Sequence, residues 1–195
     1  MSIKVCHMTS THFAKDQRIF RKECVSLAKY GYDVYLVEQG ASEERDGVHI
    51  VGTGEENKGR FYRLLKRPRN VYKIAKKLDA DIYHFHDMEL LPFGMKLKRK
   101  GKKVIFDCHE DFAPSFADSD ALPFPACVRK MLAKMYSRYE KHVVKKMDAV
   151  ISVTPHICDR LAKSNPNTVL SGMFPDKQQD FVLSINNWID RKSVV

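Results

Sequence analysis

The chain has 195 residues, of which 44% are hydrophobic, 10% aromatic and 30% charged, so it can build one sizeable core but not two full-sized domains. An excess of 34 lysines and arginines over 24 aspartates and glutamates gives a net charge of +10. An anionic partner must therefore be considered: nucleic acid, anionic lipid or a phosphorylated substrate. The composition excludes collagen-like, low-complexity and wholly disordered chains.

The cysteines and the absence of an apolar segment long enough for a signal peptide or a membrane span indicate the cellular compartment of the protein. The five cysteines are odd in number and form no Cys-x-x-Cys pair, so neither a disulfide framework nor a structural zinc site is expected. Residues 1–16 contain no apolar signal region, and no stretch approaches the roughly 18 apolar residues that cross a bilayer. We expect a soluble, cytoplasmic protein.

Short apolar runs alternate with segments of helical spacing. Strands are predicted, in chain order, at residues 3–8, 33–37, 48–52, 81–86, 103–108, 149–153 and 168–170. Helices are predicted at residues 16–30, 57–78, 89–100 and 126–146, and from Pro155 to before residue 164. Asp16 is an expected N-cap, Gly31 ends the first helix, and Pro68 interrupts or restarts the second. A loop rich in Pro and Asp is expected at 109–125.

This alternation predicts an α/β fold with a mostly parallel sheet covered by helices on both faces. In such sheets a ligand binds beyond the carboxyl ends of the strands, near the reversal of strand order. Polar residues follow four of the predicted strands at those ends: Thr9, Ser10, Thr11 and His12; His86 and Asp87; His109 and Glu110; and Thr154. We expect these residues to line one cleft.

Nucleotide and metal motifs are not supported. Gly-x-Gly-x-x-Gly does not follow the first strand, and the P-loop pattern is missing. His84 and His86 lie on the same face of a strand, because side chains alternate with period two. Further ligands at a recognisable spacing do not follow, so we predict no metal site. The preferred interpretation is one buried, hydrogen-bonded histidine and one at the rim of the cleft.

His109 and Glu110 are the candidate catalytic pair. A histidine at the end of a strand can bind a substrate hydroxyl through one ring nitrogen while a carboxylate orients the other. The alternative is a loop histidine that caps the next segment. Asp16 and Arg18 are further candidates for the cleft. The alternatives are that Asp16 is only a helix cap and Arg18 only a solvated helix residue.

A basic segment interleaved with apolar side chains suits an anionic membrane surface. Its candidate contacts are Lys58, Arg60, Arg63, Lys66, Arg67 and Arg69. Nucleic acid is not favoured, since no base-reading motif accompanies the segment, and a merely solvated basic face is the other alternative. The predicted helix at 126–146 carries a second basic set.

Four segments in order resemble the N-terminal domain of family 4-like glycosyltransferases with the GT-B architecture. They are residues 12–23 with 31–34 behind them, 81–87, 103–110 and 148–155. The resemblance covers roughly residues 1–175 and implies a Rossmann-like, doubly wound domain, one half of a GT-B fold. It also implies a retaining, metal-independent enzyme, with a nucleotide sugar as co-substrate and no permanently bound cofactor.

By the same resemblance, residues 9–16 would line the cleft, His109 would contact the donor sugar, and His86 and Asp87 would lie beside the acceptor. The donor-binding second half of the family has no counterpart here. We expect domain 1–175 to act as the acceptor-side half on a polysaccharide or lipid-linked acceptor, with a second chain supplying the other half. The alternative is a non-catalytic binding or interaction domain derived from such an enzyme.

Residues 176–195 form a tail with apolar side chains at helical spacing. We expect an amphipathic helix there, with a frayed tail as the alternative. The expected location is the cytoplasm, or its boundary with the inner face of the membrane.

Overall fold

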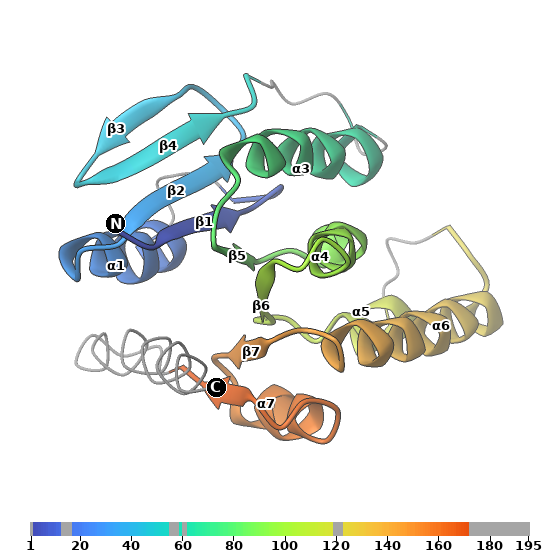
Figure 1. The fold of residues 1–195 in the computed structure, drawn as a ribbon. Coiled ribbons are helices and arrows are strands. Elements are labelled where there is room, and N and C mark those ends of the chain that lie inside the picture. Colours follow the sequence, from blue (N-terminus) through green and yellow to red (C-terminus); the bar gives the residue numbers. More distant parts are fainter. Residues whose placement is uncertain (1, 13–16, 55–58, 60–61, 119–122, 172–195) are drawn as a thin grey trace.

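The computed structural model describes residues 2–12, 17–54, 59, 62–118 and 123–171 (Figure 1). Within them, strands form one sheet in the order β3-β4-β2-β1-β5-β6-β7-β8. They are β1 (Lys4–Met8), β2 (Asp33–Glu38), β3 (Glu43–Arg45), β4 (Val48–Gly52), β5 (Ile82–Phe85), β6 (Lys103–Asp107), β7 (Ala149–Ser152) and β8 (Thr168–Leu170). All neighbouring pairs are parallel except β3 with β4, which confirms the expected fold class.

Helices cover both faces of this sheet. They are the π-helical η1 (Gln17–Cys24) and η2 (Tyr62–Lys66), the 3₁₀ turn η3 (Met88–Leu90), α1 (Val25–Lys29), α3 (Arg67–Leu78), α4 (Leu91–Lys98), α5 (Phe112–Asp118), α6 (Ala126–Val144) and α7 (Pro155–Ala162). In Figure 1, α1 lies on one side of the strands and α3, α4 and α6 lie on the other. Each side has its own cluster of buried apolar residues, so the strands are buried on both faces.

The order of the strands reverses at β1. From β1 the chain builds outward through β2 to β4 and β3, and it then returns past β1 to build β5 to β8 on the other side. The carboxyl ends of β1 and β5 therefore flank the switch point, where ligands bind in open α/β sheets.

The β3–β4 hairpin is a strand pair that the sequence pattern did not predict. Its two-residue loop, Asp46 and Gly47, has positive φ at both positions (52° and 78°), as a type I′ turn requires. The strand Glu43–Arg45 carries only charged side chains and lies at the sheet edge, so no apolar run marks it.

One other local prediction was wrong. The predicted loop at 109–125 contains α5, whose Phe112 and Phe116 pack edge-on against the Tyr136 ring of α6, with centroids 6.2 and 5.4 Å away. The first predicted helix opens with π-helical turns (Gln17–Cys24) before its α-helical part. Asp16, its expected cap, and the tail at 176–195 lie outside the described residues.

Gly94 allows α4 to pack directly on the sheet. A Cβ at this position would lie 2.5 Å from Cε1 of Phe85, a fully buried ring that stacks on Phe106. We expect Gly94→Ala to reduce the free energy of unfolding by about 1–3 kcal/mol, because overpacking outweighs the gain in helix propensity of roughly 1 kcal/mol. Urea denaturation measures this loss. The double variant Gly94→Ala/Phe85→Leu should cost less than the sum of its single changes; strict additivity would contradict the proposed clash.

Candidate functional site

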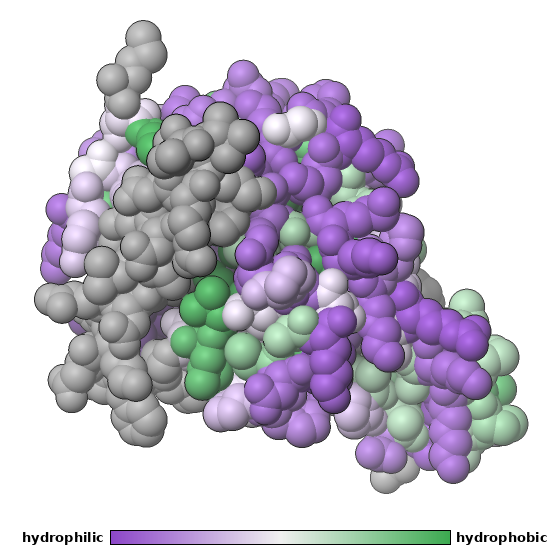
Figure 2. All heavy atoms as spheres, turned by 60° about the horizontal axis from the view of Figure 1, so that its bottom comes forward, coloured by the Kyte–Doolittle hydropathy of each residue, from purple (hydrophilic) through white to green (hydrophobic). Residues whose placement is uncertain are grey.

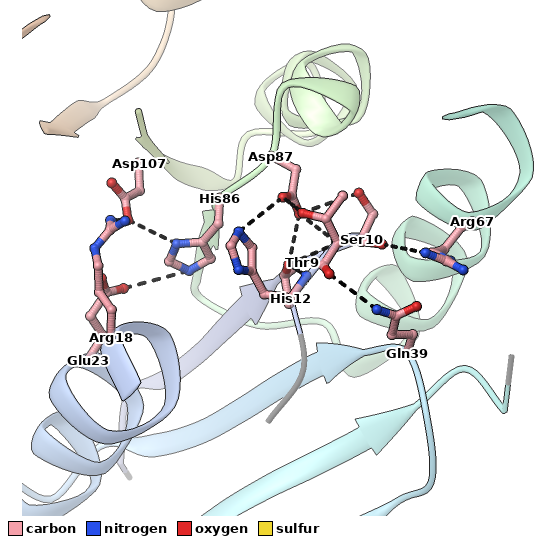
Figure 3. Close-up of polar contacts among 11 residues, drawn as sticks. Thr9, Ser10, His12, Arg18, Glu23, Gln39, Arg67, His86, Asp87 and Asp107 are labelled. Carbon is pink, nitrogen blue, oxygen red and sulfur yellow. Dashed lines mark hydrogen bonds and ion pairs between the residues drawn. The ribbon is translucent and has the colours of Figure 1, made fainter. Parts of the chain in front are cut away.

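The carboxylate of Asp87, directly after β5, organises the loop that follows β1 (Figure 3). Its Oδ2 accepts hydrogen bonds from the Thr9 hydroxyl (2.8 Å) and from the Ser10 backbone N–H (2.6 Å), and the Thr11 hydroxyl donates to its Oδ1. The His12 ring adds a contact of 3.7 Å from Nε2 to Oδ1. Asp87 is only 4% exposed, so the loss of one of these hydrogen bonds would leave a buried polar group without a partner and lower the stability of the fold. The two predicted clusters, 9–12 and 86–87, therefore meet at one place.

Two further side chains hold this loop from the other side of β1. The Arg67 guanidinium donates to the Ser10 carbonyl oxygen at 3.3 Å, and the Gln39 amide donates to the Thr11 carbonyl at 3.2 Å. Arg67 is 2% exposed, so its assignment to the basic surface was wrong. Arg67 is the first residue of α3, which follows η2 directly and has Pro68 in its first turn.

Replacing the buried Arg67 guanidinium is expected to destabilise the protein. Arg67→Met keeps the length of the side chain but removes the donor to Ser10, and we expect a loss of about 1–3 kcal/mol. The matched control is Arg69→Met on the same helix, where the arginine is exposed and a change within about 0.5 kcal/mol is expected. Thermal or urea unfolding of both variants measures the difference. Equal effects would show that the Arg67 contact contributes nothing.

His109, from the predicted cluster 109–110, lies against His12 of the cluster 9–12. The rings of His12 and His109 are 5.3 Å apart between centroids and meet edge-on. Behind His109, Asp111 forms an ion pair with Arg160 of α7 (3.4 Å), and Arg160 also binds the fully buried Glu140 of α6. This network holds the start of α5 next to the site.

Glu110 and Thr154 are both exposed. The Glu110 backbone carbonyl accepts from the Cys108 thiol, and Thr154 is the N-cap residue of α7 at the carboxyl end of β7. Their roles in the cleft stay predictions.

Glu89, in the 3₁₀ turn after Asp87, is a further candidate site residue that the sequence analysis did not single out. Burial raises its pKa, and the negative charges of Asp87 and Glu110 raise it further. A partly buried carboxyl group with a raised pKa beside other polar groups is typical of functional sites. Its position, four residues beyond the end of the central strand β5, was the available signal.

Beneath this edge lies a second polar network. His86 Nδ1 is 3.0 Å from Asp107 Oδ2, and Arg18 forms ion pairs with Asp107 and with Glu23 (Nε to Oε1, 3.5 Å; Figure 3). His84 and His86 are both buried, at 0% and 1% exposed, so placing one of them at the cleft rim was wrong. Both project to the face that η1 covers, because period-two alternation puts them on the same side of β5. Arg18 is also more than a solvated helix residue.

The predicted basic surface is present in part. Arg63, Lys66 and Arg69 are exposed, and Leu65 beside them is 69% exposed. Lys58 and Arg60 lie outside the described residues. None of the helices that the structure describes is both long and apolar enough to cross a membrane.

An apolar groove runs between α5 and α6. It has a volume of about 470 Å³ and is lined by Phe116, Leu132, Met135, Tyr136 and Tyr139. On the face seen in Figure 2, hydrophobic side chains lie among hydrophilic ones at the protruding end of the molecule that these helices form. The predicted second basic set includes exposed side chains on α6, at Lys130, Lys134, Arg138 and Lys141.

Comparison with known proteins gives one family and several similar folds. The sequence profile of Glycosyltransferase Family 4 matches residues 18–169. No curated protein matches the sequence. The fold resembles sucrose-phosphate synthase from Thermosynechococcus elongatus (TM-score 0.64, 12% identity, 87% of this chain and 48% of that one). It also resembles a UGT transferase from Siraitia grosvenorii in complex with UDP (TM-score 0.56, 9% identity, 88% of this chain and 51% of that one). A third similar fold is UDP-N-acetylglucosamine 2-epimerase from Rickettsia bellii (TM-score 0.53, 13% identity, 98% of this chain and 48% of that one). The chain thus spans about half the length of these structures, and the likeness supports half of a GT-B fold.

Proposed function

Because the chain belongs to Glycosyltransferase Family 4, we propose that it is the acceptor-side half of a glycosyltransferase. It binds a polysaccharide or lipid-linked acceptor and takes part in transfer of a sugar from a nucleotide sugar, with retention and without a catalytic metal. The observation that carries this proposal is the meeting of Asp87, the loop at 9–12 and His109 at the switch point of the sheet.

The polar groups at this edge suit a sugar acceptor. Hydroxyl-rich ligands need several donors and acceptors held at fixed positions, and Asp87 holds Thr9, Ser10 and Thr11 in one arrangement. Glycosyl transfer passes through an oxocarbenium-like transition state, which dipoles fixed around the reacting carbon stabilise. His109, packed against His12 at the rim, is the residue proposed to contact the donor sugar there.

The donor site belongs to a second unit in this proposal. The solved structures above are about twice as long as this chain, and a nucleotide sugar needs groups that neutralise its departing diphosphate. We propose that a nucleotide-sugar-binding domain faces the edge formed by β1 and β5.

Transfer measured with that second unit tests the function. The chain is mixed with a nucleotide-sugar-binding GT-B domain, and transfer from radiolabelled UDP- and GDP-sugars to membrane and polysaccharide extracts is followed. We expect transfer only when both units are present. If the chain binds an acceptor but no mixture shows transfer, the non-catalytic binding domain is favoured instead. If the chain binds neither an acceptor nor the partner domain, both the transferase and the binding-domain hypotheses are overturned.

A lipid-linked acceptor is the form that the surface favours. The groove between α5 and α6 is apolar, and the exposed Met135 lines it on a helix that also carries the exposed Met131 and basic neighbours. Leu65 lies among exposed cations on a second segment. Apolar side chains flanked by lysines and arginines are typical of surfaces that dock on anionic membranes.

Sedimentation with vesicles tests this membrane contact. The chain should pellet with phosphatidylglycerol vesicles at low ionic strength, pellet less at high salt, and stay in solution with phosphatidylcholine vesicles. Met135→Asp should reduce pelleting, whereas the control Asp159→Ala on the exposed side of α7 should not. Failure to pellet at low salt would remove the membrane from the proposal.

A further inference from the structure

Three histidines and a glutamate converge inside the protein, on the face of the sheet that η1 covers. One potential ligand atom from each of His7, His84, His86 and Glu23 lies within 4.8 Å of all the others. All four side chains are buried, with no residue more than 4% exposed. Three imidazoles and a carboxylate at this spacing form a set of metal ligands that the chain order hides, because their positions are far apart in sequence.

The sheet itself brings these groups together. His7 of β1 stands opposite His84 of β5 in the parallel register, and His86 follows two residues later on the same face. The rings are in contact, with centroids 4.6 Å apart for His7 and His84 and 4.5 Å for His84 and His86. Glu23 reaches the three rings from η1, so the fourth ligand comes from the covering helix.

Four of the separations between potential ligand atoms are close to those of a tetrahedral site. Glu23 Oε2 is 3.7 Å from His7 Nδ1, 3.9 Å from His84 Nδ1 and 3.7 Å from His86 Nε2. His7 Nδ1 and His86 Nε2 are 3.1 Å apart. Zinc–ligand bonds of roughly 2.0–2.1 Å in a tetrahedron place neighbouring ligand atoms about 3.4 Å apart. The four separations given above, from 3.1 to 3.9 Å, lie on both sides of that value.

A carboxylate behind the cluster orients one of its histidines. Asp107 Oδ2 lies 3.0 Å from His86 Nδ1, so this nitrogen donates its proton to Asp107 and Nε2 presents its lone pair to the cluster. A carboxylate that binds the outer nitrogen of a metal-ligating histidine is a usual companion of zinc sites.

The charges at this place also favour a cation. Burial lowers the pKa of His7 to about 3 and holds the pKa values of His84 and His86 well below the usual range, so the imidazoles are in the neutral form that binds metals. Arg18 supplies one positive charge for the two carboxylates of Glu23 and Asp107. The Glu23 carboxylate lies against all three rings, so a divalent cation bound among them would meet a negative charge.

We propose that His7, His84, His86 and Glu23 bind one zinc ion that fastens η1 to the centre of the sheet. Four protein ligands leave no open position, so the ion is structural and takes no part in sugar transfer. The site lies directly below the candidate acceptor edge, since His86 precedes Asp87. It stands independently of the proposed function.

Metal content and cobalt spectroscopy test the site on the full chain without an affinity tag. After loading with Zn²⁺ and desalting, we expect about one zinc per chain by mass spectrometry, and the Co²⁺-loaded chain should show the intense visible bands of tetrahedral cobalt. Glu23→Gln and His84→Gln should lose both signals. The control His49→Gln, on β4, should keep them.

A second variant does not depend on removing a ligand. Asp107→Asn leaves all four ligands in place but weakens the orientation of His86, and it should reduce zinc affinity by about 10–100-fold. A competing chromophoric chelator measures this change in the folded protein. The proposal is overturned if the unmodified chain retains no zinc or gives weak octahedral cobalt bands. It is equally overturned if the ligand variants retain as much zinc as the His49→Gln control.

Discussion

Replacing His109 by alanine is expected to lower sugar transfer in the reconstituted enzyme by about 10²–10³-fold, the usual effect of removing one group that stabilises charge in a transition state. The ring lies at the rim and packs against His12 rather than in the core, so the free energy of unfolding should change little. Transfer rates and urea unfolding, measured together, separate the two effects.

The matched control for this change is His142→Ala. Its side chain is exposed in the last turn of α6, before the start of β7, and transfer should be unaffected. An unchanged transfer rate in His109→Ala would contradict the catalytic role. It would favour the alternative, in which His109 is a loop residue that caps the next segment.

Removing the Asp87 carboxylate is expected to destabilise the fold and to release the loop at 9–12. Asp87→Ala leaves the buried donors of Thr9 and Ser10 without their acceptor, which costs about 3–5 kcal/mol of unfolding free energy. Hydrogen exchange at the Ser10 amide should accelerate along with the drop in the urea midpoint. The exposed carboxylate of Asp159 provides the control, for which Asp159→Ala should change stability by less than about 0.5 kcal/mol.

Asp87→Asn distinguishes charge from shape at the same position. The amide keeps the size of the side chain but can accept through only one oxygen, so a loss smaller than that of alanine is expected. If alanine and asparagine variants both matched the unmodified chain in stability and in Ser10 exchange, Asp87 would not organise the loop.

The strands were predictable because each central strand of a parallel sheet is buried on both faces and leaves a continuous apolar run. This holds for β1, β5 and β6, which lie at the centre. The strand Glu43–Arg45 was not predictable in the same way, since an edge strand needs no apolar residue and its pairing rests on the turn at Asp46 and Gly47. Helix α5 was missed because it depends on packing against Tyr136 of α6.

The acceptor edge was predictable in outline, because parallel strands place their carboxyl ends together. The particular contacts were not. In the sequence Arg67 is one more cation in a basic segment, and only its burial and its hydrogen bond to the Ser10 carbonyl oxygen show that it points inward. The buried cluster was hidden for another reason: His7 stands within an apolar run, and its partnership with His84 depends on the register of β1 and β5.

The central position of β1 has a consequence for how the protein forms. β1 is synthesised before the other strands of this sheet, yet Asp87, which shapes the loop after it, follows Ser10 by 77 residues along the chain. On the ribosome, β1 can pair with β2 early, but its other edge must wait until β5 has emerged. A nascent chain halted before β5 would therefore expose a half-built sheet with an unpaired central strand, the state in which chaperones should bind it most strongly.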